Sequence, residues 1–121
     1  MEEKLHIDLD LRLFAGEKRQ GPGLGALLHR IRALHSLRAA CASLDMTYSR
    51  AWNTIREAEE RLGFPLLRTA TGGRHGGGAS LTREAEDFLG AYDGFCAELC
   101  RQKEALFEKY LGAYRLPEKA E

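Results

Sequence analysis

Residues 24–62 constrain the fold more than any other part of the chain, because they carry three helical patterns separated by short breaks. Ser36 and Thr47 belong to the residue types that cap helix N-termini, so we expect a second helix after Ser36 and a third from Thr47 to about Leu62. The second helix has room for only about two turns before the chain turns at Asp45. This spacing predicts a helix-turn-helix unit. The first pattern is an apolar stripe at three- and four-residue intervals: Leu24, Leu27, Leu28, Ile31 and Leu34.

The segments on either side of this unit predict three more elements. Apolar and polar residues alternate over residues 5–13, which is the period of a half-buried strand. Residues 69–82, TATGGRHGGGASLT, are rich in glycine and lie between two short apolar stretches, which predicts a strand–loop–strand wing. Thr82 is a candidate cap for a helix of about thirty residues.

Together these patterns predict a mainly α protein of the α+β class. We expect a winged helix-turn-helix with an N-terminal strand, a two-stranded glycine-rich wing and a long C-terminal dimerisation helix. The predicted parts are an N-terminal strand and turn at 1–23, the DNA-binding domain at 24–82, and the dimerisation helix with a short tail at 83–121. The chain's 121 residues suffice for one domain with its own core.

The distribution of charge favours a nucleic-acid partner although the formal net charge is zero. No acidic residue occurs between Glu17 and Asp45, or between Glu60 and Glu84, whereas both intervals contain several arginines. The compensating acidic residues follow mostly in the C-terminal third. We therefore expect one basic side, which faces duplex DNA.

The third helix is expected to enter the major groove, with its first two turns facing the bases. Arginine can bind guanine, asparagine can bind adenine, and serine can bond either a base or a phosphate. Trp52 borders the apolar stripe, so we expect it to be partly buried and structural. The residues expected to contact DNA from the helices are Ser36, Arg38, Thr47, Tyr48, Ser49, Arg50, Asn53 and Arg56. Those expected from the wing are Arg68, Thr71, Gly72, Gly73, Arg74, His75, Gly76 and Gly77, because glycine lets the backbone approach a phosphate closely.

The long C-terminal helix carries apolar residues along most of its length, and a second copy of the chain is the simplest partner for them. The residues expected at this dimer interface are Leu89, Tyr92, Phe95, Leu99, Leu106 and Tyr110.

The motifs YSRAW and LGFPLLRTATGGRHGGGASLT resemble the N-terminal DNA-binding domain of the ModE family of molybdate-responsive transcription regulators. The similarity covers about residues 20–95 and is strongest in the wing. ERLGFPLL and LTREAEDFL are also similar to the wider LysR-type winged helix. The resemblance implies a homodimer joined through the long helix, with recognition helices in successive major grooves. Family members carry a C-terminal molybdate-binding region, whereas this chain ends at Glu121. We therefore expect no effector domain and no cofactor; molybdate enters only through the resemblance, and a separate effector-binding protein is a candidate partner.

Three other classes of function remain as alternatives. An enzyme is disfavoured because the chain has no P-loop, no GxGxxG unit and no nucleophile elbow. Cys96 and Cys100 stand four residues apart on one helix face, which suits a metal- or redox-responsive regulator, although buried reduced thiols with no metal are the simpler interpretation. A dimeric adaptor that does not bind DNA is the third alternative. Without a secretory signal or an apolar stretch long enough for a membrane, the protein is expected in the bacterial or archaeal cytoplasm, at the nucleoid.

Overall fold

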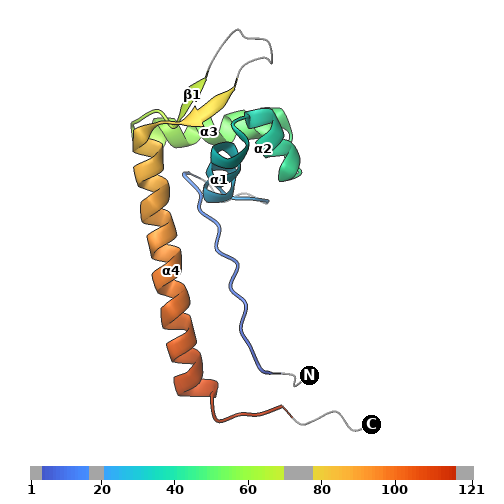
Figure 1. Ribbon diagram of the computed structural model, residues 1–121, viewed down its shortest axis with the longest axis vertical. Coiled ribbons are helices and arrows are strands. Elements are labelled where there is room, and N and C mark those ends of the chain that lie inside the picture. The colour runs from blue at the N-terminus through green and yellow to red at the C-terminus, as the bar shows by residue number, and fades with distance from the viewer. Residues whose placement is uncertain (1–3, 17–20, 70–77, 117–121) are drawn as a thin grey trace. The chain divides into compact units, whose positions relative to one another are not determined.

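The computed structural model describes residues 4–16, 21–69 and 78–116. The chain divides into two compact units, residues 12–92 and residues 1–11 together with 93–121. Figure 1 shows the elements of both units in chain order. They are the helices α1 (Leu24–Leu34), α2 (Leu37–Ser43), α3 (Tyr48–Leu62) and α4 (Arg83–Leu111), with the strands β1 (Leu67–Thr69) and β2 (Ala79–Leu81) between α3 and α4.

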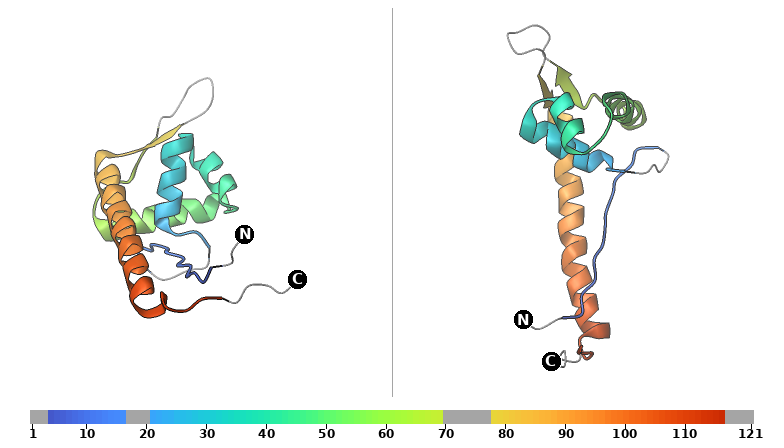
Figure 2. Two further views of the ribbon diagram at one scale, coloured as in Figure 1. Left: turned by 60° about the horizontal axis from the view of Figure 1, so that its bottom comes forward. Right: turned by 90° about the vertical axis from the view of Figure 1, so that its right-hand side faces the viewer.

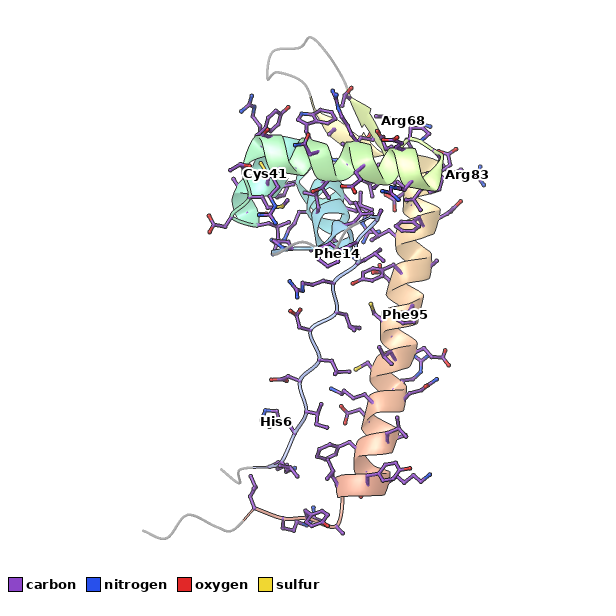
Figure 3. All side chains as sticks on the ribbon, turned by 180° about the vertical axis from the view of Figure 1, so that it is seen from behind. His6, Phe14, Cys41, Arg68, Arg83 and Phe95 are labelled. Atoms are coloured by element: carbon purple, nitrogen blue, oxygen red, sulfur yellow. The ribbon has the colours of Figure 1, made fainter. Side chains whose placement is uncertain are left out.

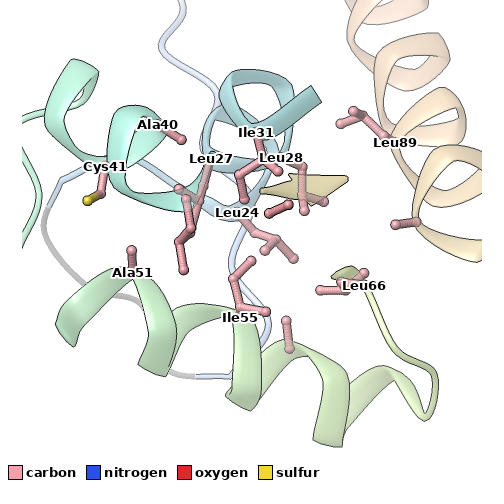
Figure 4. Close-up of a cluster of buried hydrophobic side chains, with 14 residues drawn as sticks. Leu24, Leu27, Leu28, Ile31, Ala40, Cys41, Ala51, Ile55, Leu66 and Leu89 are labelled. Atoms are coloured by element: carbon pink, nitrogen blue, oxygen red, sulfur yellow. The ribbon is translucent and has the colours of Figure 1, made fainter. Parts of the chain in front are cut away.

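The core of the first unit is formed by the apolar stripes of the helices, as their spacing predicts. Its side chains come from α1, α2, α3, the wing and the beginning of α4, and they converge on one cluster (Figure 4). Burying leucine and isoleucine side chains stabilises a domain by about 1.5–3 kcal/mol each, so this cluster holds the three helices together. The largest fully buried side chains are Leu24, Leu27, Leu28, Ile31, Ile55, Leu66 and Leu89.

The helices begin and end where the sequence provides capping groups. The Ser36 hydroxyl accepts a hydrogen bond from the Ala39 N–H at 3.0 Å, and the Thr47 hydroxyl accepts one from the Arg50 N–H at 3.2 Å. Gly63, with a φ of 84°, ends α3 in the left-handed region. These caps confirm the expected boundaries of α2 and α3.

The turn between α2 and α3 is closed by backbone hydrogen bonds around a left-handed residue. Asp45 has a φ of 56°, a conformation that aspartate tolerates better than most residues. The Met46 N–H then donates to the Cys41 carbonyl at 2.9 Å, as in a Schellman motif. This turn sets the direction in which α3 leaves α2.

The wing is a pair of short antiparallel strands. Leu67 pairs with Leu81, Arg68 with Ser80 and Thr69 with Ala79. The Ala79 N–H donates to the His35 carbonyl at 3.0 Å, so β2 is joined to the corner between α1 and α2; Figure 2 shows the strand pair beside these helices. Residues 70–77, which include the predicted tip contacts Thr71, Gly72, Gly73, Arg74, His75, Gly76 and Gly77, lie outside the described residues.

The N-terminal segment differs from its prediction. Residues 5–13 form no strand, and β1 and β2 are the only strands among the described residues. A strand needs a neighbouring backbone with which to exchange hydrogen bonds, and alternation of side chains alone does not supply one. Within the second unit, the Ile7 carbonyl instead accepts a hydrogen bond from the Lys103 ammonium at 3.2 Å.

Candidate nucleic-acid interface

The exposed side of α3 is polar along its whole length. Ala51, Ile55 and Ala58 are buried on the opposite side, so the residues about half a turn away from them face solvent. Ser49, Asn53 and Arg56 are exposed on this side, followed by the acidic Glu60. Hydrogen-bonding groups suited to base edges and phosphates therefore occupy the first two turns, and repulsive carboxylates follow them.

Arg50 is exposed too, but it lies on one flank of α3. A side chain at position 21 would come within 3.6 Å of its guanidinium, so Arg50 borders the segment that leads into α1. Its long side chain can still reach past the helix surface, as arginine side chains do at nucleic-acid interfaces. Asn53 is the more central residue of the exposed side, with Arg50 toward one flank and Arg56 toward the other.

The opposite flank carries a row of two aromatic side chains with a cationic side chain at each end, which sequence analysis did not identify. The Arg38 guanidinium lies 4.3 Å from the centre of the Tyr48 ring. The Tyr48 and Trp52 rings meet edge to face, with their centres 6.3 Å apart and an interplanar angle of 89°. The Arg56 guanidinium lies 5.5 Å from the centre of the Trp52 ring. Positions 48, 52 and 56 are four residues apart, so the sequence spacing could have suggested the part of the row on α3. Arg38 comes from α2, and only tertiary packing brings it to Tyr48.

Three more residues expected to contact DNA are Ser36, Thr47 and Arg68. Ser36 is half-buried and its hydroxyl caps α2, whereas Thr47 is exposed while its hydroxyl caps α3. A hydroxyl oxygen that accepts from the backbone keeps its own hydrogen for a further acceptor, so both can still donate to a phosphate. Arg68 is exposed on β1, where Figure 3 labels it.

The wing is attached to α3 through a carboxylate and to α4 through a hydroxyl. The Glu59 carboxylate accepts the Leu66 N–H at 2.7 Å. Thr82, which is buried, donates to the Pro65 carbonyl at 2.6 Å and accepts from the Ala85 N–H at 3.0 Å. The Glu59 bond fixes the base of the wing against α3, the helix that presents Asn53, and the Thr82 bonds fix it against the start of α4.

The dimerisation residues predicted on α4 divide into two groups. Leu89 is fully buried in the core of the first unit and is therefore a core residue, which corrects its assignment to a dimer surface. Tyr92 packs against the same core. Phe95, Leu106 and Tyr110 are 61%, 53% and 67% exposed within the second unit, and Leu99 is half-buried.

The cysteines do not form a recognisable metal centre. Cys41 is buried, Cys96 is half-buried and Cys100 is exposed, and all three are free thiols. Among the described residues no three histidine, cysteine or acidic side chains are close enough together to hold a metal ion.

These features define a winged helix-turn-helix, a class of DNA-binding domain. Residues 26–86 match the lysR family of bacterial regulatory helix-turn-helix proteins, and the chain belongs to that family. The match includes α2, α3 and the wing, so it covers the surface described above.

Individual relatives agree with this assignment. The chain is 35% identical to the transcriptional regulator ModE of Haemophilus influenzae over 89 residues, which are 74% of this chain and 33% of that protein. It is 33% identical to the DNA-binding transcriptional dual regulator ModE of Escherichia coli K12 over 74% of this chain and 32% of that protein. The molybdenum-pterin-binding protein MopB of Rhodobacter capsulatus is 33% identical over 77% of this chain and 34% of that protein.

The chain thus spans about a third of the length of the curated relatives it matches. The family and the relatives confirm the predicted ModE-like helix-turn-helix and support a DNA-binding transcription regulator. In the part of the chain that the structure describes, no helix has the length and hydrophobicity to cross a membrane.

Proposed function

We propose that the protein is a sequence-specific regulator of transcription that binds duplex DNA as a homodimer in the cytoplasm, without catalysing a reaction. The observation that carries this proposal is the exposed side of α3, where Ser49, Asn53 and Arg56 lie within the first three turns after the capped N-terminus. In a helix-turn-helix these turns contact base edges in the major groove, while the helix before them crosses the backbone.

The remaining contacts serve affinity more than sequence choice. Ser36 and Arg38 at the start of α2, together with Thr47, Tyr48 and the wing residue Arg68, are proposed to contact the sugar-phosphate backbone. The tip residues Arg74 and His75, and the glycines around them, are proposed to rest on a neighbouring groove edge. Arg50 is proposed to contact a base or a phosphate from its flank.

The second unit supports dimerisation. Phe95, Leu106 and Tyr110 of α4 are exposed. Together with Leu99 they follow one another at intervals of four, seven and four residues, which places all of them on one side of the helix. Water-exposed apolar stripes of this kind mark protein–protein contacts. Two copies would place two recognition helices on one duplex, so the operator is expected to be a palindrome.

Selection of bound sequences from a random duplex library tests the proposal. We expect enrichment of a palindromic sequence and binding that weakens steeply as salt rises, because phosphate contacts release counterions. Parallel selections with and without molybdate test whether the effector of the resembling family acts on this chain. A library that emerges without enrichment, with binding insensitive to salt, would favour the adaptor function instead.

A metal- or redox-responsive regulator is a weaker candidate because the thiols of Cys96 and Cys100 lack a third ligand among the described residues. Replacing both with serine separates the two functions. Bound zinc in the wild type, together with altered DNA affinity in the variant, would support the sensor.

A further inference from the structure

The cation–aromatic row, defined as Arg38, Tyr48, Trp52 and Arg56, joins the two helices that meet DNA in the proposed function. The Arg38 guanidinium lies 4.3 Å from the centre of the Tyr48 ring, the two ring centres are 6.3 Å apart, and the Arg56 guanidinium lies 5.5 Å from the centre of the Trp52 ring. The row thus extends from the first turn of α2 along about two turns of α3. Each guanidinium lies at one end, with an aromatic ring beside it. Both arginines and Tyr48 are exposed, and Trp52 is half-buried.

The row lies on the side of α3 that faces the wing. Glu59 follows Trp52 by seven residues, which places both on the same side of the helix. The Glu59 carboxylate bonds to the Leu66 N–H at the beginning of the wing. The row therefore lies on the side of α3 that contacts the beginning of the wing.

Stacking on a ring face restricts an arginine without using its donors. The guanidinium plane is attracted by the electrons of the ring, and its five N–H groups remain able to donate at its edges. A free arginine loses much rotamer freedom when it binds a phosphate or a base, and a stacked arginine has lost part of it already. A ring beside an exposed arginine can therefore raise DNA affinity by orienting that arginine, in addition to any contact of its own.

We propose that Tyr48 and Trp52 are positioning residues, which hold Arg38 and Arg56 in the conformations that bind the DNA backbone or base edges. This inference rests on the proposed DNA-binding function. It also assigns a role to Trp52, which the spacing along α3 indicated only as a structural residue. The two ends of the row act separately: Tyr48 orients Arg38, and Trp52 orients Arg56.

A double-mutant cycle on the full chain tests the pair at the C-terminal end of the row. The probe is the palindromic duplex obtained from the selection, and its affinity is measured over a range of salt concentrations. Trp52→Leu is expected to weaken binding about two- to fivefold, the worth of an exposed cation–π contact. Trp52→Phe keeps a ring and is expected to retain most of the affinity. In an Arg56→Ala background, Trp52→Leu should have almost no further effect.

The salt dependence distinguishes positioning from loss of a charge. Arg56→Ala is expected to reduce the slope of log affinity against log salt by about 1 if the arginine binds a phosphate. Trp52→Leu leaves every cation in place, so it should lower affinity at all salt concentrations with the slope unchanged. Arg61→Ala, which changes an exposed arginine near the other end of α3, is the matched control and should leave the coupling intact.

The outcomes separate this inference from the function beneath it. If the wild type shows no salt-dependent binding to any duplex, the proposed function fails. If it binds, but Trp52→Leu lowers DNA affinity by the same factor with and without Arg56, then Trp52 acts independently of Arg56 and the inference is wrong. Circular dichroism checks the fold of each variant. If Trp52→Leu does not fold, the cycle of Tyr48→Leu with Arg38→Ala carries the same test at the other end of the row.

Discussion

At the scale of single residues, local chemistry decides where the chain changes direction. Asp45 and His35, with φ values of 56° and 55°, are the non-glycine residues in left-handed conformations among those described. Each follows a helix and lets the next element begin at once. Polar side chains then complete the turns, and Thr82 does so twice, because its hydroxyl serves both the wing and α4.

Replacing Thr82 by valine should lower the free energy of unfolding by about 1–3 kcal/mol. The variant keeps the shape of the buried Thr82 side chain, but the Pro65 carbonyl and the buried Ala85 N–H both lose their hydrogen-bond partner. Urea denaturation measures the change. Thr82→Ser keeps the hydroxyl and should cost less than the valine variant; an equal cost for both would show that the hydroxyl bonds contribute nothing.

Asn53→Ala should lower affinity for the selected operator by about 1–3 kcal/mol and relax the sequence preference at one position of each half-site. Arg50→Ala should cost a similar amount if this arginine is bidentate to guanine. Binding of the selected duplex and of a scrambled duplex gives the specific share of each loss. Unchanged specificity after replacing both residues would exclude this side of α3 as the recognition surface.

At the scale of elements, the helices were largely predictable and the N-terminal segment was not. Helix boundaries depend on side chains close in sequence: Ser36 and Thr47 cap their own helices, and Gly63 ends the third. Residues 5–13 alternate as a strand does, but strand formation depends on a partner that may lie anywhere in the chain. Local patterns cannot specify such a partner.

Two glycines, one where α1 contacts α4 and one with free space around it, should change stability in opposite directions when replaced by alanine. A Cβ at Gly25 would collide with the Tyr92 ring, whereas one at Gly90 would meet no atom within 4 Å. We expect Gly25→Ala to destabilise the first unit by about 1–3 kcal/mol through overpacking. Gly90→Ala should stabilise it by about 0.5–1 kcal/mol, because alanine favours a helix interior.

Thermal and urea unfolding of the two variants give these signs. Tyr92→Leu removes the ring, so Gly25→Ala should become nearly harmless in that background. Stabilisation by alanine at both glycines would contradict the close approach of the two helices.

At the scale of the whole molecule, α4 belongs to two units and serves each differently. Its first turns complete the core, where Leu89 is buried, and its later turns leave Phe95, Leu106 and Tyr110 exposed. The periodicity of α4 indicated an apolar stripe throughout, but it could not divide the stripe between a core and a free surface. That division follows from where the other helices of the first unit pack.

Phe95→Glu together with Leu106→Glu should convert the proposed dimer into a monomer, because two carboxylates would enter its apolar interface. Sedimentation velocity measures the state of association. Affinity for the palindromic operator should fall far more than affinity for a half-site. Ala97→Glu adds a carboxylate to an exposed position elsewhere on the same helix and should leave the dimer intact. A wild-type protein that sediments as a monomer at all concentrations would contradict the proposal.

The sequence specifies the helices, their caps, the wing strands and the polar side of α3, because each depends on residues a few positions apart. It also carried the ModE-like motifs that the family match confirms. Tertiary packing, in contrast, makes Leu89 a core residue, leaves residues 5–13 without strand structure, and brings Arg38 of α2 onto the ring of Tyr48 in α3. These outcomes depend on which distant segments pack together, and no local pattern of side chains encodes that choice.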